Sequence, residues 1–300
     1  MTIPDAIRRR VEARWGAVRE ARPVGGGSIS RALRLELPGG PAFLKYNDGA
    51  PAGMFPAEAR GLEALRHAAG DGLRVPEVRA AFDPAEAGAP GEPGWILMEW
   101  IEPGPRDSGF GERLGRGLAL LHRGTDGRIG WEEDNFIATL PQPNAEAASW
   151  TEFWRDRRLE PQLRRARGAG HAPGDPRDWE RLFAGLPGLL SPGDEVVPSM
   201  LHGDLWSGNV LASAAGEPCL VDPAAYRGHR EVDLAMADLF GGFPERFRAA
   251  YEEVWPLLPG YREGRRAAYQ LFPLLVHVNL FGGGYVAQTR AALLQALAAM

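Results

Sequence analysis

The most informative stretch of this sequence is LHGDLWSGNVLASAAGEPCLVD, residues 201–222. Apolar residues flank a short polar turn that contains His202, Asp204 and Asn209. A second apolar approach, CLVD, ends in Asp222, eighteen residues after Asp204. The pattern predicts an acid and an amide on one loop, with another acid at the end of the next strand.

These spacings match the catalytic motif of kinases. Asp204 and Asn209 reproduce the H-x-D-x-x-x-x-N spacing of the kinase catalytic loop, and kinases place their main magnesium ligand on an Asp after the following strand. Mg²⁺ prefers hard oxygen ligands, while one carboxylate must accept the proton of the attacking hydroxyl. We therefore predict Asp204 as the base, Asn209 and Asp222 as Mg²⁺ ligands, and ATP as the phosphoryl donor.

Lys45 is the only lysine of the chain, although Lys and Arg together number 34. It lies in the strand-like segment AFLKY, after a glycine-rich turn and before a predicted helix that carries Glu58. In kinases such a lysine holds the α and β phosphates and pairs with a helix Glu. A compact ammonium suits that site better than a wide guanidinium fork, so we predict a catalytic, ATP-binding Lys45 paired with Glu58.

Several of these signals are weak alone, whereas the spacing of Asp204, Asn209 and Asp222 is specific. GGGSIS lacks the full G-x-G-x-x-G and could be an ordinary hairpin, and Glu58 alone would be a helix-surface residue. His202 is interpreted as structural rather than catalytic. Trp206 is open between a core residue and a sugar-stacking face. The order of the whole set along the chain favours a kinase.

Composition limits the alternatives. The 300 residues carry a formal charge of −5 and no long basic block, which argues against nucleic-acid binding. A single cysteine, Cys219, excludes an intramolecular disulfide and suits a reducing compartment. No apolar run approaches ~20 residues, so we expect no membrane span and a cytoplasmic protein.

The predicted fold class is α+β, with two lobes as in protein kinases. Residues 1–101 are expected to form a nucleotide-binding lobe, a small antiparallel sheet with one main helix over residues 54–70. Residues 1–20 are also expected to be helical. Residues 102–300 are expected to form a larger, mainly helical lobe that carries the catalytic and substrate-binding groups. The boundary is placed where strand-like patterns give way to helical ones.

The chain closely resembles the fructosamine kinase (ketosamine 3-kinase) family. The resemblance runs from about residue 5 to the C-terminal helix, through GGGSIS, FLKYN, LMEWI, LHGDLWSGNV and YQLFPLLVHVNLFGGGY. The Trp after HGDL and the segment DNFIATLPQPN separate this family from the aminoglycoside and choline kinases, which share its fold.

The resemblance implies an ATP- and Mg²⁺-dependent kinase. It would phosphorylate the 3-hydroxyl of ketoamines such as fructosamines, ribulosamines or erythrulosamines, free or on protein lysines. The unstable product would release the amine, a deglycation. Trp206 would line the sugar pocket. The nucleotide would be covered by a glycine-rich loop and read by a hinge: Gly25, Gly26, Gly27, Ser28, Ile29 and Ser30, then Glu99, Trp100 and Ile101.

Two departures from related patterns matter. Several family members carry Cys in the glycine-rich loop, where this chain has Ser28, so a monomer is favoured over a disulfide-linked dimer. DPA replaces the kinase D-F-G at Asp222, so no Phe-flip regulation is expected. Two alternatives stay open: an aminoglycoside- or choline-kinase-like phosphotransferase, and a catalytically silent nucleotide-binding scaffold. The sequence does not identify the sugar, the amine or the oligomeric state.

Overall fold

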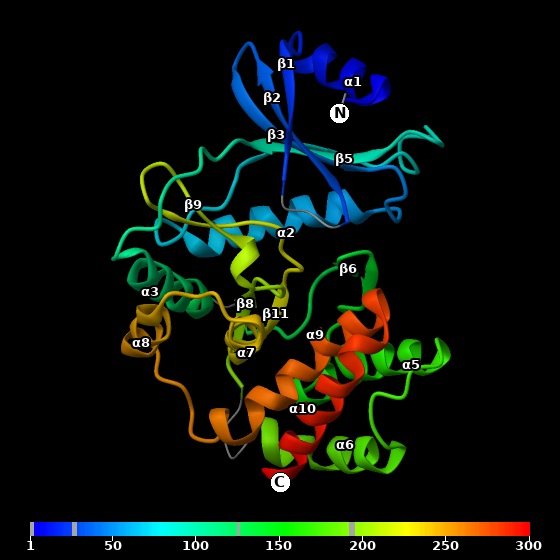
Figure 1. Cartoon of the computed structure of the whole chain (residues 1–300), viewed down its shortest axis with the longest axis vertical. Helices are drawn as coiled ribbons and strands as arrows, with labels where there is room; N and C mark the ends of the chain where they lie inside the picture. Colours follow the sequence, from blue (N-terminus) through cyan, green and yellow to red (C-terminus); the bar gives the residue numbers. More distant parts are fainter. Residues whose placement is uncertain (1–2, 26–28, 125–126, 192–195) are drawn as a thin grey trace.

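The computed structural model describes residues 3–25, 29–124, 127–191 and 196–300. The predicted two-lobed, kinase-like fold is confirmed (Figure 1). A small lobe built on an antiparallel sheet lies above a larger helical lobe, and the chain ends at the far end of the larger lobe. No helix within the described ranges is long and apolar enough to cross a bilayer.

The small lobe contains a five-stranded sheet in the order β1-β2-β3-β5-β4, with every neighbouring pair antiparallel. The strands and the two helices of this lobe are β1 (Glu20–Val24), β2 (Arg31–Leu37), β3 (Gly40–Asn47), β4 (Val78–Phe82), β5 (Gly94–Glu99), α1 (Asp5–Trp15) and α2 (Met54–Ala69). The first helix is shorter than the predicted range because Gly16, at φ +82°, ends it before β1 begins.

Side-chain alternation divides this sheet into two faces. Leu33, Leu35 and Leu44 point to one face and form a core with Ile7 and Val11 of α1. The opposite face packs on α2, which lies between the sheet and the helical lobe (Figure 1). Odd-numbered residues of β3 lie on that second face, so the sheet places Lys45 over α2.

The large lobe is helical around short β hairpins. Its helices are α3 (Phe110–Arg123), α4 (Trp150–Phe153), α5 (Glu160–Gly168), α6 (Pro176–Leu190), α7 (Glu231–Phe240), α8 (Glu245–Val254), α9 (Arg266–Phe281) and α10 (Val286–Ala298), with π-helical turns η1 (Trp154–Leu159) and η3 (Tyr261–Arg265) and 3₁₀ turns η2 (Ser207–Asn209) and η4 (Gly283–Tyr285). Its strands are β6 (Asn135–Ile137), β7 (Leu140–Gln142), β8 (Pro198–Leu201), β9 (Val210–Ala212), β10 (Pro218–Leu220) and β11 (Tyr226–His229).

One hydrophobic core joins the lobes. Leu62 and Leu65 of α2 belong to the same buried cluster as Leu114 of α3 and Leu201 of β8. Because α2 packs into both lobes, it fixes the small lobe over the catalytic-loop region. The boundary between residues 101 and 102 stays a prediction.

Candidate active site

A buried ion-pair cluster joins the two lobes. Lys45 Nζ lies 3.0 Å from both carboxylate oxygens of Glu58 on α2 and 3.1 Å from Asp222 Oδ1. The Lys45 and Glu58 side chains are 14% and 8% exposed, whereas Asp222 is 43% exposed. Burial opposes the charge of Lys45, but Asp222 and Glu58 outweigh it and raise the lysine pKa. The ammonium is therefore kept charged, with Asp222 facing the solvent side.

The loop after β8 needs glycine at its turn. Gly203 has φ +79°, and a Cβ there would lie 2.0 Å from the carbonyl oxygen of Ala224. The loop and the segment after Asp222 therefore approach each other as closely as backbones can. Ala224 N also donates to His202 O at 2.9 Å, so the two polar segments recognised in the sequence are tied together.

His202 supports this loop through both ring nitrogens. Its Nδ1 accepts from Asp204 N at 3.2 Å, which leaves the proton on Nε2 to donate to Val221 O at 2.9 Å. Burial lowers the pKa of His202, which keeps the ring in this neutral form. The geometry therefore agrees with the structural interpretation of His202.

Asn209 links the candidate base to Asp222. Its Nδ2 donates to Asp204 O at 2.9 Å and Oδ2 at 3.1 Å, and lies 3.4 Å from Asp222 O. With the amide nitrogen used this way, Oδ1 is the atom left to act as a ligand. Burial raises the pKa of Asp204 to about 7, against the opposing hydrogen bond from Asn209.

Asp222 has an unusual backbone. Its φ of 54° places a non-glycine residue in the left-handed region, which costs free energy and is concentrated at functional sites. The residue before it, Val221, donates its backbone N–H to Asn209 O at 3.1 Å. The bend directs the Asp222 carboxylate to Lys45.

The sequence analysis missed Asp233 on α7, which anchors the catalytic loop. Its fully buried carboxylate accepts from His202 N at 2.7 Å and Gly203 N at 2.9 Å. It also accepts from Nε2 of buried His122 on α3 at 3.2 Å. The signal was present in EVDLAMAD, where an acid interrupts an apolar helix and so must find partners inside the protein.

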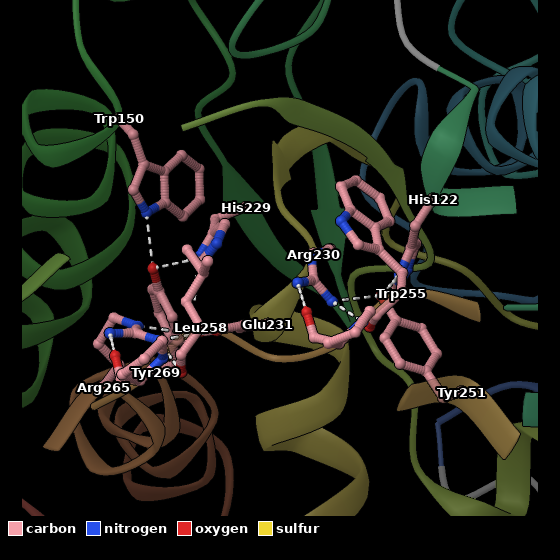
Figure 2. Close-up of polar contacts among 12 residues, drawn as sticks. His122, Trp150, His229, Arg230, Glu231, Tyr251, Trp255, Leu258, Arg265 and Tyr269 are labelled. Carbon is pink, nitrogen blue, oxygen red and sulfur yellow. Dashed lines mark hydrogen bonds and ion pairs between the residues drawn. The ribbon is translucent and has the colours of Figure 1, made fainter. Parts of the chain in front are cut away.

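A directed chain of hydrogen bonds stands behind Asp233, and Figure 2 shows its part from His122 through Tyr251 to Arg230. Burial lowers the pKa of His122, so its neutral ring donates from Nε2 to Asp233 and accepts at Nδ1 from Tyr251 OH, 2.9 Å away. Tyr251 OH in turn accepts from Arg230 Nη1 at 3.3 Å. Arg230 also donates to the carbonyls of Trp255 and Pro256.

A second buried group fixes the first turn of α7 from the opposite side (Figure 2). Glu231 accepts two hydrogen bonds from Arg265, at 2.7 and 2.9 Å. Tyr269 OH lies 2.7 Å from His229 Nδ1 and accepts from Trp150 Nε1 at 3.0 Å. With both sides of its start bound, α7 holds Asp233, and through it the loop, in one position.

A cavity of ≈ 420 Å³ opens between the lobes. Every described candidate residue lines it: Gly25, Ile29, Ser30, Lys45, Glu58, Glu99, Trp100, Ile101, Asp204, Trp206, Asn209 and Asp222. Gly26, Gly27 and Ser28 lie outside the described residues. The structure therefore brings residues from most of the chain to one cleft of the size of a small-molecule site.

Several side chains already have partners elsewhere. The carboxylate of Glu99 pairs with Arg74, and the Trp100 ring stacks on Phe43 with centroids 6.4 Å apart. At this predicted hinge, therefore, these two side chains are already engaged, and so is the backbone N–H of Glu99, which donates to Glu77 O at 2.8 Å. The buried hydroxyl of Ser30, in contrast, has no hydrogen-bond partner among the described residues.

Trp206 lines the cavity and is 38% exposed. Its ring covers Gly208, where an added Cβ would come within 2.1 Å of the ring. The glycine thus leaves room for the indole over the loop, and a partly exposed ring that lines a cavity is suited to stacking on a ligand. This makes Trp206 a cleft residue rather than a core residue.

The donor set suits Mg²⁺ by its chemistry. Asn209 offers Oδ1, and Asp222 offers the carboxylate oxygen not paired with Lys45. Mg²⁺ is commonly bound by one or two such oxygens together with substrate phosphates and water. By contrast, Cys219 is buried, and burial raises its thiol pKa to about 12, so it is unsuited to ligation or catalysis.

Comparisons with known proteins agree over nearly the whole chain. The model of the fructosamine kinase family matches residues 4–299. A probable ketoamine kinase from Synechocystis is 40% identical over 93% of this chain and 91% of its own length. A chloroplastic protein-ribulosamine 3-kinase from Arabidopsis thaliana is 37% identical over 94% of this chain and 84% of its own.

Solved structures agree with these relatives. A crystal structure from Thermobifida fusca that carries the name of a fructosamine-3-kinase superposes with a TM-score of 0.83 at 37% identity, over 98% of this chain and 99% of that one. An aminoglycoside phosphotransferase superposes with a TM-score of 0.62 over 98% of both chains. At 15% identity, this second likeness concerns the fold alone.

Proposed function

The chain belongs to the fructosamine kinase family, and we propose that it transfers the γ-phosphoryl group of ATP to the 3-hydroxyl of a ketoamine. Membership makes it a phosphotransferase with a sugar hydroxyl as acceptor. The observation that carries the proposal is the meeting of Lys45, Asp204, Asn209 and Asp222 in one cleft beside Trp206.

Asp204 is the proposed base. Its carboxylate accepts the proton of the 3-hydroxyl as that oxygen forms its bond to the γ-phosphorus and the bond to the ADP oxygen breaks. A pKa of about 7 lies near neutral pH, where a carboxylate can be ionised and still take up a proton. The hydrogen bond from Asn209 orients it, and Asp233 fixes the loop behind it.

Lys45 and Glu58 are the proposed phosphate-positioning pair. Glu58 fixes the ammonium by two 3.0 Å contacts, which leaves a compact positive charge facing the cleft. Ser30 provides a hydroxyl without a partner in the described chain, and we assign it to the phosphates together with the glycine-rich segment 25–30. Asn209 and Asp222 would hold Mg²⁺, which supplies charge neutralisation on the phosphate oxygens.

Two parts of the cleft have different roles in this account. Backbone groups of Glu99 and Ile101 would bind the adenine edge, since the Glu99 side chain is paired with Arg74. Trp206, which lines the same cleft, would stack on the sugar.

The 3-hydroxyl has a chemical reason. In a ketoamine the carbonyl carbon, C2, lies between the amine-bearing C1 and C3. Loss of a C1 proton gives an enaminol, from which a phosphate on C3 is expelled with its bonding electrons. Hydrolysis of the resulting imine then frees the amine. We assign the enzyme to deglycation, on free ketoamines or on glycated protein lysines.

A coupled assay of ADP release tests the proposal. The substrates are ribulosyl-lysine, fructosyl-lysine and an aminoglycoside, each with Mg-ATP, and Asp204→Asn is the control. Turnover of a ketoamine that disappears in the control is the expected result. Turnover of the aminoglycoside alone would contradict the ketoamine assignment. ATP binding without turnover of any acceptor would favour a silent scaffold.

A further inference from the structure

The segment DNFIATLPQPN, residues 134–144, contains polar side chains that the proposed mechanism does not use. Asn135 and Gln142 pair across the β6–β7 hairpin, Asn144 follows the hairpin, and Arg158 of η1 lies against it. All four side chains are buried, and we call these four residues the amide network. A hairpin of two three-residue strands is marginal on its own, so its place in the lobe depends on such contacts.

The hydrogen bonds of the amide network run in one direction. A guanidinium only donates, so Asn144 Oδ1 accepts from Arg158 Nη2 at 2.7 Å. The Asn144 amide nitrogen is therefore the donor to Asn135 Oδ1, 2.8 Å away. This leaves Asn135 Nδ2 to donate to Ala225 O at 2.8 Å. One buried cation thus orients two amides and, through them, fixes a backbone carbonyl.

Gln142 adds a second bond to the same stretch of backbone. Its Nε2 donates to Asn135 Oδ1 at 2.8 Å and to Ala224 O at 3.1 Å. Its Oε1 is buried with no hydrogen-bond partner among the described residues. An apolar side chain of the same length would fill this site without an unpaired oxygen. The glutamine is therefore explained by its two donor bonds and not by packing.

The carbonyls that the network holds belong to the segment after Asp222. Pro223 has no N–H, so the first N–H after Asp222 is that of Ala224, which donates to His202 O at 2.9 Å. The amide network holds the carbonyls of Ala224 and Ala225. The φ of 54° at Asp222 needs this support, because a strained backbone persists only where its surroundings fix it.

The same segment packs on α2. A Cβ added at Gly61 would lie 3.2 Å from Ala225 Cβ, so the helix approaches the segment closely at this glycine. Gly61 is three residues after Glu58, on the same side of the helix, and Glu58 contacts Lys45. In Figure 1 the hairpin of β6 lies just below one end of α2. The amide network therefore fixes Asp222 relative to the lysine side of the cleft.

We propose that the amide network positions Asp222, so that its carboxylate oxygen not paired with Lys45 stays available to Mg²⁺. This rests on the proposed function, in which Asp222 is a Mg²⁺ ligand. In protein kinases the loop that follows the corresponding Asp is ordered by phosphorylation. In this chain buried amides fix the segment after Asp222, so the ligand is held in place without an activating modification.

The test measures ADP binding by titration calorimetry, once with Mg²⁺ and once with EDTA, and takes the ratio of the two dissociation constants. Asn135 lines the cleft and is left unchanged. The main variant is Gln142→Met, which keeps the length of the side chain and removes both donor bonds. The matched control is Gln270→Met on α9, since the Gln270 amide also donates to a backbone carbonyl, that of Ala235, at 3.0 Å.

Asn144→Asp tests the direction of the network and keeps a partner for Arg158. The new carboxylate pairs with the guanidinium, which compensates its buried charge. It also presents an oxygen to Asn135 Oδ1. The Asn135 amide can satisfy that oxygen only by reversing, which withdraws its donor from Ala225 O. Asp222→Asn changes the proposed ligand itself and gives the ratio expected when the site is damaged directly.

The native chain is expected to bind ADP more tightly with Mg²⁺ than with EDTA. Gln142→Met should reduce this gain roughly tenfold, the lower end of the usual effect of a group that orients a metal ligand, and leave the affinity in EDTA unchanged. Asn144→Asp should also reduce the gain, and Gln270→Met should not change it. A lower Tm alone does not move this ratio, so positioning is separated from general stabilisation.

An unchanged gain in Gln142→Met and Asn144→Asp would overturn the proposal, and so would an equal loss in Gln270→Met or in EDTA. If Gln142→Met does not fold, Asn144→Asp decides. A gain that Asp222→Asn leaves intact would remove Asp222 as a Mg²⁺ ligand, and this inference would fail with that assignment. Because no acceptor is present, the outcome does not depend on the ketoamine assignment.

Discussion

Lys45 Nζ of the small lobe lies 3.1 Å from Asp222 Oδ1 of the large lobe. The same ammonium is held by Glu58 from below the sheet. The only lysine of the chain therefore joins the lobes at the point where they enclose the cleft. A substitution there tests positioning and charge together.

Lys45→Met and Lys45→Arg are both expected to lower kcat/KM by roughly 10²–10³-fold, the usual cost of one preorganised group that stabilises developing charge. Arginine keeps the charge but its wider fork cannot replace an ammonium with three close contacts. The measurement is steady-state kinetics with varied ATP. Lys45→Arg at near-native activity would contradict the need for a compact charge. Arg181→Lys, at an exposed position, is the control for the reverse exchange.

The pH dependence of kcat/KM reports the proposed base. Asp204 must be ionised to accept a proton, and burial raises its pKa to about 7. Activity is therefore expected to rise about tenfold per pH unit well below 7 and to level off above it. Residual activity of Asp204→Asn should lack this limb. A flat profile of the native chain from pH 5.5 to 8 would argue against Asp204 as the base.

Asp204→Asn is expected to stabilise the protein while it removes activity. The folded pKa of Asp204 lies above its unfolded value, so between about pH 4 and pH 7 the folded state binds more protons and native stability falls as pH rises. The Asp204→Asn variant has no carboxyl group to ionise at this position, so it does not show this fall in stability. The advantage of the Asn variant in unfolding free energy should grow up to pH 7 and then stay constant, at about 1–2 kcal/mol after discount for partial exposure, with a matching rise in Tm.

Thermal unfolding of nucleotide-free protein, at pH values from 5 to 8, measures this difference. The Asn side chain can still accept from Asn209 through its oxygen, so the comparison isolates the charge. A variant whose Tm lies below that of the native chain at pH 8 would refute the expected gain.

Tyr251→Phe tests the hydrogen-bond chain behind Asp233. Without the hydroxyl, Nδ1 of His122 and one donor of Arg230 lose their buried partner, which costs about 1–3 kcal/mol of unfolding free energy. Ser199→Ala is the control, because the Ser199 hydroxyl is buried with no partner among the described residues. Denaturant unfolding gives the loss of unfolding free energy for each variant. Equal losses would show that the hydrogen bonds from Arg230 through Tyr251 to His122 contribute nothing specific.

The same variant has a readout beyond stability. If these hydrogen bonds position the catalytic loop, Tyr251→Phe lowers kcat while KM for ATP stays nearly constant. Loss of stability with an unchanged kcat would limit these hydrogen bonds to a structural role.

The sequence predicted much of the fold because its cues were local. Alternation in β2, the strand-like pattern of β3 and the helical spacing of α2 predicted the elements that carry Lys45 and Glu58, and the kinase pattern predicted their pairing. The loop residues were found because H-x-D-x-x-x-x-N is a fixed local geometry. Such signals need no knowledge of how distant segments pack.

Other parts of the site depend on distant packing. Asp233 reaches the loop across 30 residues of sequence, and His122 reaches Asp233 across 111. The acid in EVDLAMAD signals a buried group, but nothing local shows which distant groups it contacts, so the sequence analysis missed both contacts. The ring contact between His277 and Tyr285 was also missed, because LVHVNLFGGGY reads as an ordinary helix end until the glycine turn brings the two rings together.

The central claim is phosphorylation of a ketoamine at its 3-hydroxyl. The most direct measurement is a proton–phosphorus correlation spectrum of the product formed from ribulosyl-lysine and Mg-ATP, recorded as the reaction proceeds. The account predicts a new phosphorus signal coupled to the proton on C3, followed by inorganic phosphate and free lysine. A stable product with phosphate coupled to a different carbon, or no new phosphorus signal while ATP stays intact, would contradict it.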